Sequence, residues 1–309
     1  MKRWEKKGLI YCPKGEAEWM KSWFMAPTPY LADEETIRIY GCIRDKDGVG
    51  RIGYVDVEAK NPSVVKYVSK TPALDIGEDG CFDDNGLVMG DLVKKDGKLY
   101  LWYTSFQHVQ KAKFYAFSGA AVSYDNGKTF VRRRKYPVMD RTEEGLFGRC
   151  IHTVIYDEKR DVYRVWYSTI FDWTYINGIP YPTYDIKYIE SKDGLNFPDE
   201  GVQCIRCKDN EYRIGRPRVR ILDDGSYEIH YTFDTLKKEY IAGYAVSKDG
   251  INWTRKDEEL DWLKKPSGEW DKEMSCYVCP FDTKYGKYLF YNGNNMGEDG
   301  FGYAELIEE

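Results

Sequence analysis

The stretch "KLYLWYTSF" at residues 98–106 decides the fold, because related stretches return along the chain. Its aromatic and apolar residues, interleaved with polar ones, are typical of a β-strand. The related stretches are "IRIYGCIRD" (37–45), "VYRVWYSTI" (162–170), "SYEIHYTFD" (226–234) and "KYLFYNGNN" (287–295). Measured between the tyrosines that they share, Tyr40, Tyr103, Tyr167, Tyr231 and Tyr291, the spacings are 63, 64, 64 and 60 residues. This regularity predicts an internal repeat of about 64 residues.

Each repeat contains further strand-like elements. A short run precedes each marker tyrosine: "MAPTPYL" (25–31), "VMGDLV" (88–93), "CIHTVIY" (150–156), "GRPRVRI" (215–221) and "CYVCPFD" (276–282). A third strand follows, and in three repeats it ends in a Ser-x-Asp turn with a glycine, at Ser123–Gly127, Ser191–Gly194 and Ser247–Gly250. Asp and Gly favour tight turns, so these motifs predict hairpins that lead into a fourth strand.

Five radially arranged units of four antiparallel strands are typical of a five-bladed β-propeller. We therefore expect an all-β chain that forms a single propeller domain over residues 1–309. The last repeat lacks a fourth strand, and "GLIYCP" (8–13) could supply it and close the ring.

Composition narrows the function. The net charge is −5 without a long basic run, which argues against a nucleic-acid partner. No apolar run approaches the length of a membrane span, and we expect a cytoplasmic protein without a membrane partner. The eight cysteines include the pairs Cys204/Cys207 and Cys276/Cys279, which have the spacing of a zinc knuckle. Residues i and i+3 of a strand point to opposite faces, so buried free thiols are the preferred interpretation.

In a propeller the first strand of each blade lines the central channel, where ligands bind. The polar residues in and beside these strands are the candidate site: Thr28, Asp91, His152, Arg216, Arg218, Glu273 and Tyr277. Structural alternatives remain for several of them. Asp91 could cap a turn, His152 could be a hydrogen-bonded core residue, and Glu273 could belong to a solvated loop. The two arginines could pair with carboxylates of neighbouring blades.

The repeat and the segments "FDDNGLVMGDLVKKDGKLYLWYT" (82–104), "IKYIESKDGLNF" (186–197) and "AGYAVSKDGINW" (242–253) resemble the five-bladed glycosidase-like propellers. "GRPRVRI" and "WDKEMSCYVCPFD" (270–282) belong to the same resemblance, which covers residues 23–306. The related proteins are the glycoside hydrolases of families 43, 32 and 68. The nearest subgroup is associated with surface-polysaccharide gene clusters.

In those hydrolases, blades one to three each supply a carboxylate. Asp91 matches the blade-two position, but "MAPTPYL" has no acid, and His152 stands where the acid glutamate is expected. Glycoside hydrolysis requires two carboxyl groups, one to protonate the leaving oxygen and one to activate water or attack. A relocated pair is one solution, with Asp91 as base and Glu273 or His152 as acid.

We therefore expect Asp91, Glu273 and His152 to be catalytic, and Arg216, Arg218, Tyr277 and Thr28 to bind substrate. Arginine forks match carboxylates and phosphates, which favours an anionic saccharide or a nucleotide-sugar in polysaccharide metabolism. A non-catalytic sugar-binding protein, or a glycosyltransferase- or phosphorylase-like use of the fold, is the alternative. No cofactor is expected. The resemblance allows a structural calcium ion, although no ligand cluster in the sequence requires one.

Overall fold

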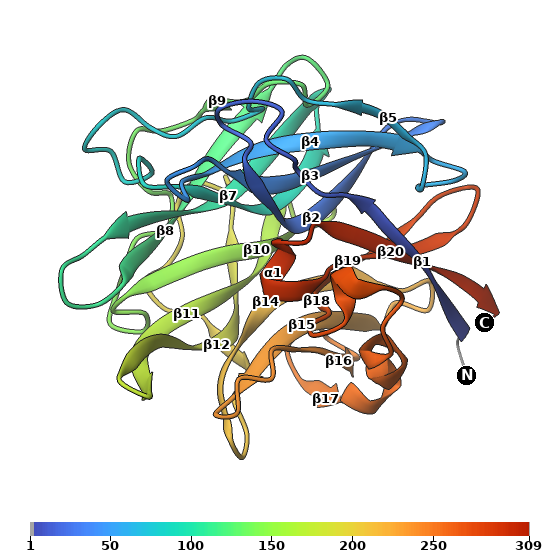
Figure 1. Ribbon diagram of the computed structural model, residues 1–309. Helices are drawn as coiled ribbons and strands as arrows, with labels where there is room; N and C mark the ends of the chain where they lie inside the picture. The colour runs from blue at the N-terminus through green and yellow to red at the C-terminus, as the bar shows by residue number, and fades with distance from the viewer. Residues whose placement is uncertain (1–2, 309) are drawn as a thin grey trace.

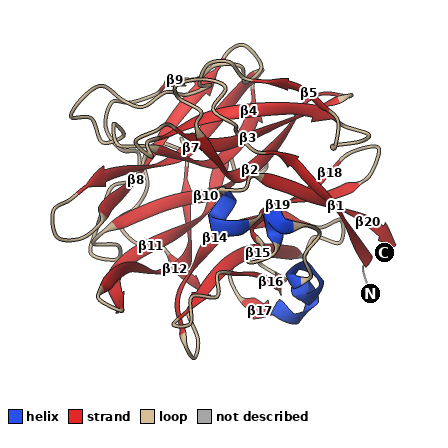
Figure 2. Ribbon diagram, viewed as in Figure 1, coloured by secondary structure: helices blue, strands red, loops and turns tan. Residues whose placement is uncertain are grey.

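The computed structural model describes residues 3–308, which form antiparallel sheets with very little helix (Figures 1 and 2). The helical segments are the 3₁₀ helices η1 (Asp257–Lys264) and η2 (Glu269–Asp271) and the short turn α1 (Asn294–Gly297). No helix in residues 3–308 has the length and apolar character needed to cross a membrane.

The strands follow one another as antiparallel meanders, each made of strands that are consecutive in the chain. The first meander contains β2 (Ser22–Asp33), β3 (Thr36–Arg44), β4 (Gly50–Glu58) and β5 (Val65–Val68). The second contains β6 (Leu87–Lys95), β7 (Lys98–His108), β8 (Phe114–Ser123) and β9 (Val131–Arg132). The third contains β10 (Gly148–Asp157), β11 (Val162–Ile176), β12 (Ile179–Ser191) and β13 (Val202–Ile205). The fourth contains β14 (Glu211–Ile221), β15 (Tyr227–Thr235), β16 (Ile241–Ser247) and β17 (Trp253–Arg255).

The last meander joins the two ends of the chain. It contains β18 (Cys276–Asp282), β19 (Lys287–Asn292) and β20 (Phe301–Glu308), and β1 (Arg3–Tyr11) pairs antiparallel with β20. The strand expected at residues 8–13 is thus the end of a longer one. Figure 1 shows the described ends of the chain lying next to each other.

The first strands of successive meanders contact one another: β2 with β6, β6 with β10, β10 with β14, β14 with β18, and β18 with β2. The hydrophobic core lies between neighbouring meanders. The cluster around Tyr40, for example, combines residues of β3 and β4 with Leu99, Leu101 and Tyr103 of β7. All eight cysteines are free thiols, and Cys276 and Cys279 are buried.

The marker tyrosines are anchors within this core. All five are at most 1% exposed. Tyr40 donates a hydrogen bond to the carbonyl of Gly127, and each of the other four donates to a carboxylate. Burial of a phenol requires a partner for its hydroxyl, so the repeat preserves the tyrosine together with an acceptor.

The Ser-x-Asp turns connect neighbouring meanders. In the turn at Gly194, the glycine amide donates to Ser191 Oγ at 3.0 Å, and its carbonyl accepts from Trp102 Nε1 at 2.8 Å. Gly250 repeats this arrangement with Trp166 of β11 at 2.7 Å. Because the indole belongs to the preceding meander, each turn fastens two units together.

A β-bulge interrupts every first strand at the same place. The register against the second strand shifts between Met25 and Thr28, Met89 and Asp91, Ile151 and Thr153, Gly215 and Arg218, and Cys276 and Cys279. Bulges redirect side chains and are common beside functional sites. Three bulge residues have left-handed φ values, 63° at Ala26, 57° at Arg216 and 52° at Tyr277.

Candidate functional site

The candidate site is a cavity of about 310 Å³, here called the central cavity, that all five first strands help to line. The first strands contribute Met25, Val88, Cys150, His152, Arg213, Arg216 and Tyr277. Residues of other segments complete the wall: Arg44, Thr104, Phe106, Lys113, Phe114, Ser168, Ile170, Tyr181, Pro182, Tyr184, Tyr240 and Met296. The lining therefore combines cations, hydroxyl groups and aromatic rings, and none of these described residues is Asp or Glu.

Arg216 is the most unusual side chain in this lining. It is 7% exposed and has a left-handed backbone, which an L-residue adopts at a cost of about 1–2 kcal/mol. Its Nη1 donates to the carbonyl of Met89, while Nε and Nη2 have no hydrogen-bond partner within residues 3–308. The guanidinium carbon lies 5.5 Å from the centre of the Tyr277 ring.

No carboxylate in residues 3–308 forms an ion pair with Arg216. Burial, together with the charge of Arg218, lowers the pKa of Arg216 to about 10, so the guanidinium still carries its charge at neutral pH. A buried cation with two free donor nitrogens is energetically unfavourable unless an anion or water occupies the space in front of it.

His152 lies next to Arg216, with Nδ1 at 3.3 Å from Arg216 Nη1. Because a guanidinium can only donate, Nδ1 must be the acceptor and Nε2 must carry the proton. Burial and the charges of Arg216 and Arg218 hold the pKa of His152 well below its usual value. The imidazole is therefore neutral and acts as a hydrogen-bond donor more readily than as a base.

Two hydroxyl groups in the lining also lack partners among the described residues, Thr104 Oγ1 and Ser168 Oγ. Each follows a marker tyrosine. At the equivalent position in the next repeat, Thr232 Oγ1 accepts a hydrogen bond from the amide of the bulge residue Tyr277 at 3.1 Å. Asn292 does the same for Ala26 at 2.7 Å. The hydroxyls of Thr104 and Ser168 thus occupy a position that elsewhere is used for structure.

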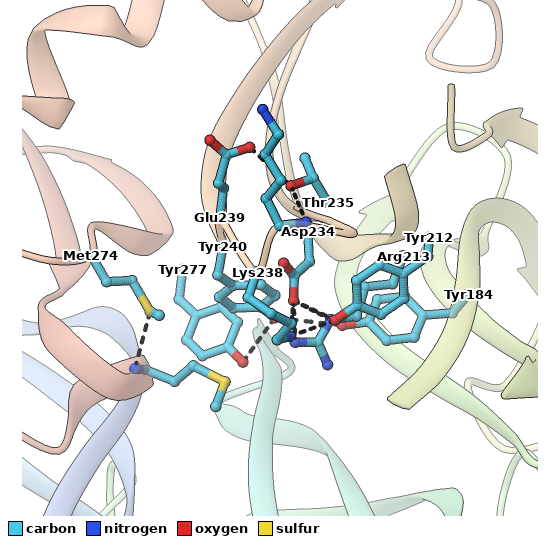
Figure 3. A network of polar contacts seen from close by, with 12 residues as sticks. Tyr184, Tyr212, Arg213, Asp234, Thr235, Lys238, Glu239, Tyr240, Met274 and Tyr277 are labelled. Atoms are coloured by element: carbon cyan, nitrogen blue, oxygen red, sulfur yellow. Dashed lines mark hydrogen bonds and ion pairs between the residues drawn. The ribbon is translucent and has the colours of Figure 1, made fainter. Parts of the chain in front are cut away.

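The side of the cavity formed by β14 is organised by Asp234 (Figure 3). Its Oδ2 accepts hydrogen bonds from Arg213 Nη2 at 2.6 Å and from Lys238 Nζ and Tyr212. Tyr240 donates to Tyr277 at 3.0 Å beside this network. Burial raises the pKa of both Tyr240 and Tyr277, so both phenols stay protonated at neutral pH.

A second layer of polar residues does not line the central cavity. Arg218 Nη2 donates to Thr28 Oγ1, its Nη1 donates to the carbonyl of His152 at 2.8 Å, and Asp91 Oδ1 lies 3.3 Å from the same nitrogen. Asp91 also accepts from the amide of Val154 at 2.8 Å. Burial outweighs Arg218 and raises the pKa of Asp91. These contacts fasten β2, β6, β10 and β14 together, which is the ion-pairing alternative considered for Arg218.

Glu273 lies elsewhere, in the segment between η2 and β18. It is exposed, and its amide donates to Asn294 Oδ1 at 2.8 Å. It lines a different pocket of about 250 Å³, which also includes Lys238, Tyr240 and Asp271. Glu273 and Asp91 therefore do not share a cavity.

The structure thus divides the predicted site residues into three groups. His152, Arg216 and Tyr277 line the central cavity, Thr28, Asp91 and Arg218 form the second layer, and Glu273 borders another pocket. The sequence interpretation missed Thr104, Ser168 and Arg213. The hydroxyl residue after Tyr103 and Tyr167 was a usable signal for the first two. Within residues 3–308, no group of three or more His, Cys, Asp or Glu is arranged to hold a metal ion.

Comparison with solved structures identifies the class of fold. Three similar structures are described as a "Glycoside hydrolase" (TM-score 0.70, 17% identity, 97% of this chain and 90% of that one), a complex of BT0996 and RGII (0.69, 16%, 98% and 92%) and "a thermostable family-43 glycoside hydrolase" (0.65, 15%, 95% and 93%). The protein is thus all-β, and its structural neighbours are propellers of the glycoside hydrolase kind.

Among curated proteins, the chain is similar to "Uncharacterized protein Rv1502" of Mycobacterium tuberculosis strain H37Rv. The two are 29% identical over 306 residues, which cover 98% of this chain and 99% of the relative. No family model matches the chain.

Proposed function

We propose that this protein is a carbohydrate-active propeller that binds an anionic saccharide in the central cavity. The observation that carries the proposal is Arg216, a buried guanidinium with two free donor nitrogens and no ion-pair partner in the described residues. A sugar carboxylate or phosphate would satisfy these donors with the bidentate geometry that arginine prefers.

The remainder of the lining supports a small sugar ligand. The volume of about 310 Å³ lies at the lower end of the roughly 300–1,000 Å³ typical of ligand sites. Aromatic rings such as Phe106, Phe114 and Tyr181 provide apolar walls, and Thr104 and Ser168 offer unpaired hydroxyls that could bond to those of a sugar. The structural neighbour described as a complex with RGII supports a saccharide as the partner.

The overall organisation agrees with this proposal. We infer a five-bladed propeller in which β1 completes the last blade, because β1 pairs with β20 and the first strands contact one another from β2 through β18 and back. We also propose a role in polysaccharide metabolism in the cytoplasm. The free state of all eight cysteines supports a reducing compartment.

Binding is better supported than hydrolysis by two carboxylates. Such hydrolysis requires two acids close to the scissile bond, and the described lining of the central cavity contains none. The catalytic roles of Asp91 and Glu273 stay predictions. A transferase-like reaction is the second candidate, because His152 carries its proton on Nε2 and could donate it toward a leaving oxygen.

Titration calorimetry with defined sugars tests the proposal. Glucuronic acid and glucose 1-phosphate are compared with neutral glucose, using the wild-type protein and Arg216→Gln. We expect at least one of the anionic sugars to bind about tenfold more tightly than glucose, and the substitution to remove that difference. UDP-glucose in the same series tests nucleotide-sugars.

Arg220→Gln is the matched control, because Arg220 lies on the same strand but pairs with Glu228 and Asp282 outside the central cavity. Equal affinity for glucose and for the anionic sugars would contradict the proposal. Anion binding that persists unchanged in Arg216→Gln would contradict it as well.

A further inference from the structure

We propose that the central cavity takes a saccharide with two anionic groups, one bound by Arg216 and the other by a second cationic group of residues. This cationic edge consists of Lys113, Arg213 and Lys238, which surround Tyr181. The inference rests on the proposed function, because it assigns a second anion site to the same cavity.

The cationic edge is defined by its distances to one aromatic ring. Lys238 Nζ lies 4.0 Å, Lys113 Nζ 4.5 Å and the guanidinium carbon of Arg213 5.8 Å from the centre of the Tyr181 ring. The three cations therefore gather around one side chain. Lys113, Arg213 and Tyr181 themselves line the central cavity.

A single carboxylate balances these charges. Asp234 pairs with Arg213 at 2.6 Å and with Lys238, and it is fully buried (Figure 3). Lys113 has no ion pair with any carboxylate among residues 3–308. Three cations with one paired anion leave an excess of about two positive charges at the cavity wall.

The environment makes this excess unfavourable without a ligand. Burial and the nearby charge of Arg213 lower the pKa of Lys113, and burial is the main cause that lowers the pKa of Lys238. Crowded cations destabilise one another's charged forms, and a bound anion reverses that effect. The geometry of the edge and the direction of these shifts thus agree.

Two tyrosines connect the edge to Arg216. The guanidinium of Arg213 lies 4.7 Å from the Tyr240 ring centre, and that of Arg216 lies 5.5 Å from the Tyr277 ring centre. The two rings pack edge to face with centres 5.7 Å apart. Both cationic ends therefore border one small cavity, and a ligand of one or two sugar rings can face both.

Calorimetry with three probes tests the inference. Glucuronic acid carries one carboxylate, glucose 1-phosphate carries one phosphate, and glucuronic acid 1-phosphate carries both groups on one ring. We expect the doubly anionic sugar to bind at least about tenfold more tightly than either singly anionic one at low ionic strength, where electrostatic contributions are least screened.

Lys113→Gln identifies the second site. We expect this substitution to reduce the affinity for glucuronic acid 1-phosphate about fivefold or more, and to change the affinity of the singly anionic probe that depends on Arg216 by less than about twofold. Lys111→Gln is the matched control, because Lys111 is an exposed lysine two residues away and outside the described cavity lining. It should leave all affinities unchanged.

The outcomes separate the two proposals. If single anions bind through Arg216 but the second charge adds no affinity, or Lys113→Gln behaves like Lys111→Gln, the two-anion inference is wrong and the proposed function stands. If no probe binds in a manner that depends on Arg216, the proposed function fails and the inference fails with it.

Discussion

Arg216 combines three unfavourable properties in one residue: a left-handed backbone, a buried charge and two unpaired donors. Such costs persist where a binding site requires them, and they are released when the side chain is removed. Arg216→Gly removes all three, because glycine adopts a positive φ without strain. We expect the ligand-free variant to gain about 1 kcal/mol of stability and to lose its affinity for anionic sugars.

Differential scanning calorimetry without ligand measures this change, which corresponds to a rise in Tm of about 2–4 °C. Ala26→Gly is the matched control, since Ala26 has a similar φ at the equivalent bulge but carries no charge. It should gain only the part that comes from backbone strain. A fall in Tm for Arg216→Gly would show that the arginine stabilises the ligand-free fold.

Asp91 is the main counter-charge of the buried Arg218 in the second layer. Asp91→Asn leaves that guanidinium without a carboxylate, and breaking a buried pair costs about 3–5 kcal/mol. We expect urea denaturation to report a loss of about 3 kcal/mol in the free energy of unfolding.

Glu273→Gln is the comparison, because an exposed carboxylate outside the second layer should change stability by less than about 0.5 kcal/mol. Equal stability of Asp91→Asn and the wild type would contradict the assigned ion pair. If a substrate is found, loss of turnover in Glu273→Gln with unchanged stability would support the catalytic role predicted for this residue.

At the scale of the structural elements, the Ser-x-Asp turns can be tested at Gly194. This residue has a φ of 67°, and a β-carbon there would lie 2.6 Å from the Trp102 ring. Gly194→Ala therefore adds a steric clash to the backbone strain, and we expect a loss of about 2–4 kcal/mol in the free energy of unfolding.

Gly225→Ala separates the two contributions. Gly225 has a φ of 82°, but no atom lies within 4 Å of the position that a β-carbon would take there. We expect it to lose only the strain of about 1–2 kcal/mol. If both variants lose the same amount in chemical denaturation, the contact with Trp102 does not fasten the two meanders.

The strands themselves could be predicted from the sequence because their markers are chemically uniform. A tyrosine in an aromatic strand pattern recurs along the chain, and each marker tyrosine is buried in the second strand of its meander. The bulges could not be predicted. Register depends on pairing with the neighbouring strand, and Pro27 and Pro217 interrupt the alternation that would have revealed it.

At the scale of the whole molecule, the same limit explains the site. Sequence reasoning assigned Arg216 and Arg218 to one binding group, since both lie on one first strand. The bulge at Arg216 directs its side chain to the central cavity and leaves Arg218 to bind Asp91 and Thr28. Convergence of the first strands was therefore predictable from the repeat, whereas the assignment of each side chain to a layer required the three-dimensional register.

The contact between β1 and β20 should control the stability of the whole molecule. Lys6 on β1 pairs with the buried Asp271 at 2.8 Å, and Trp4 stacks on Trp262 at 6.1 Å between ring centres. Deleting residues 1–11 removes both contacts and leaves β20 as an open edge. We expect Tm to fall by more than about 10 °C and the variant to self-associate, because an unpaired edge recruits other strands.

Scanning calorimetry together with light scattering measures both effects. Lys14→Gln, in the exposed segment after β1, is the control and should behave as the wild type. A truncated protein that stays monomeric with an unchanged Tm would show that the β1–β20 pair is dispensable.

The pairing of β1 with β20 also imposes an order on synthesis. The strand that leaves the ribosome first must wait for the strand that leaves last, and at roughly 5–20 residues per second this takes roughly 15–60 s for a protein of this length. During that time β1 is an orphan edge in a crowded cell. Its sequence "RWEKKGLIY" carries Arg3, Lys6 and Lys7, charges that discourage pairing with a wrong partner until the nascent polypeptide is complete.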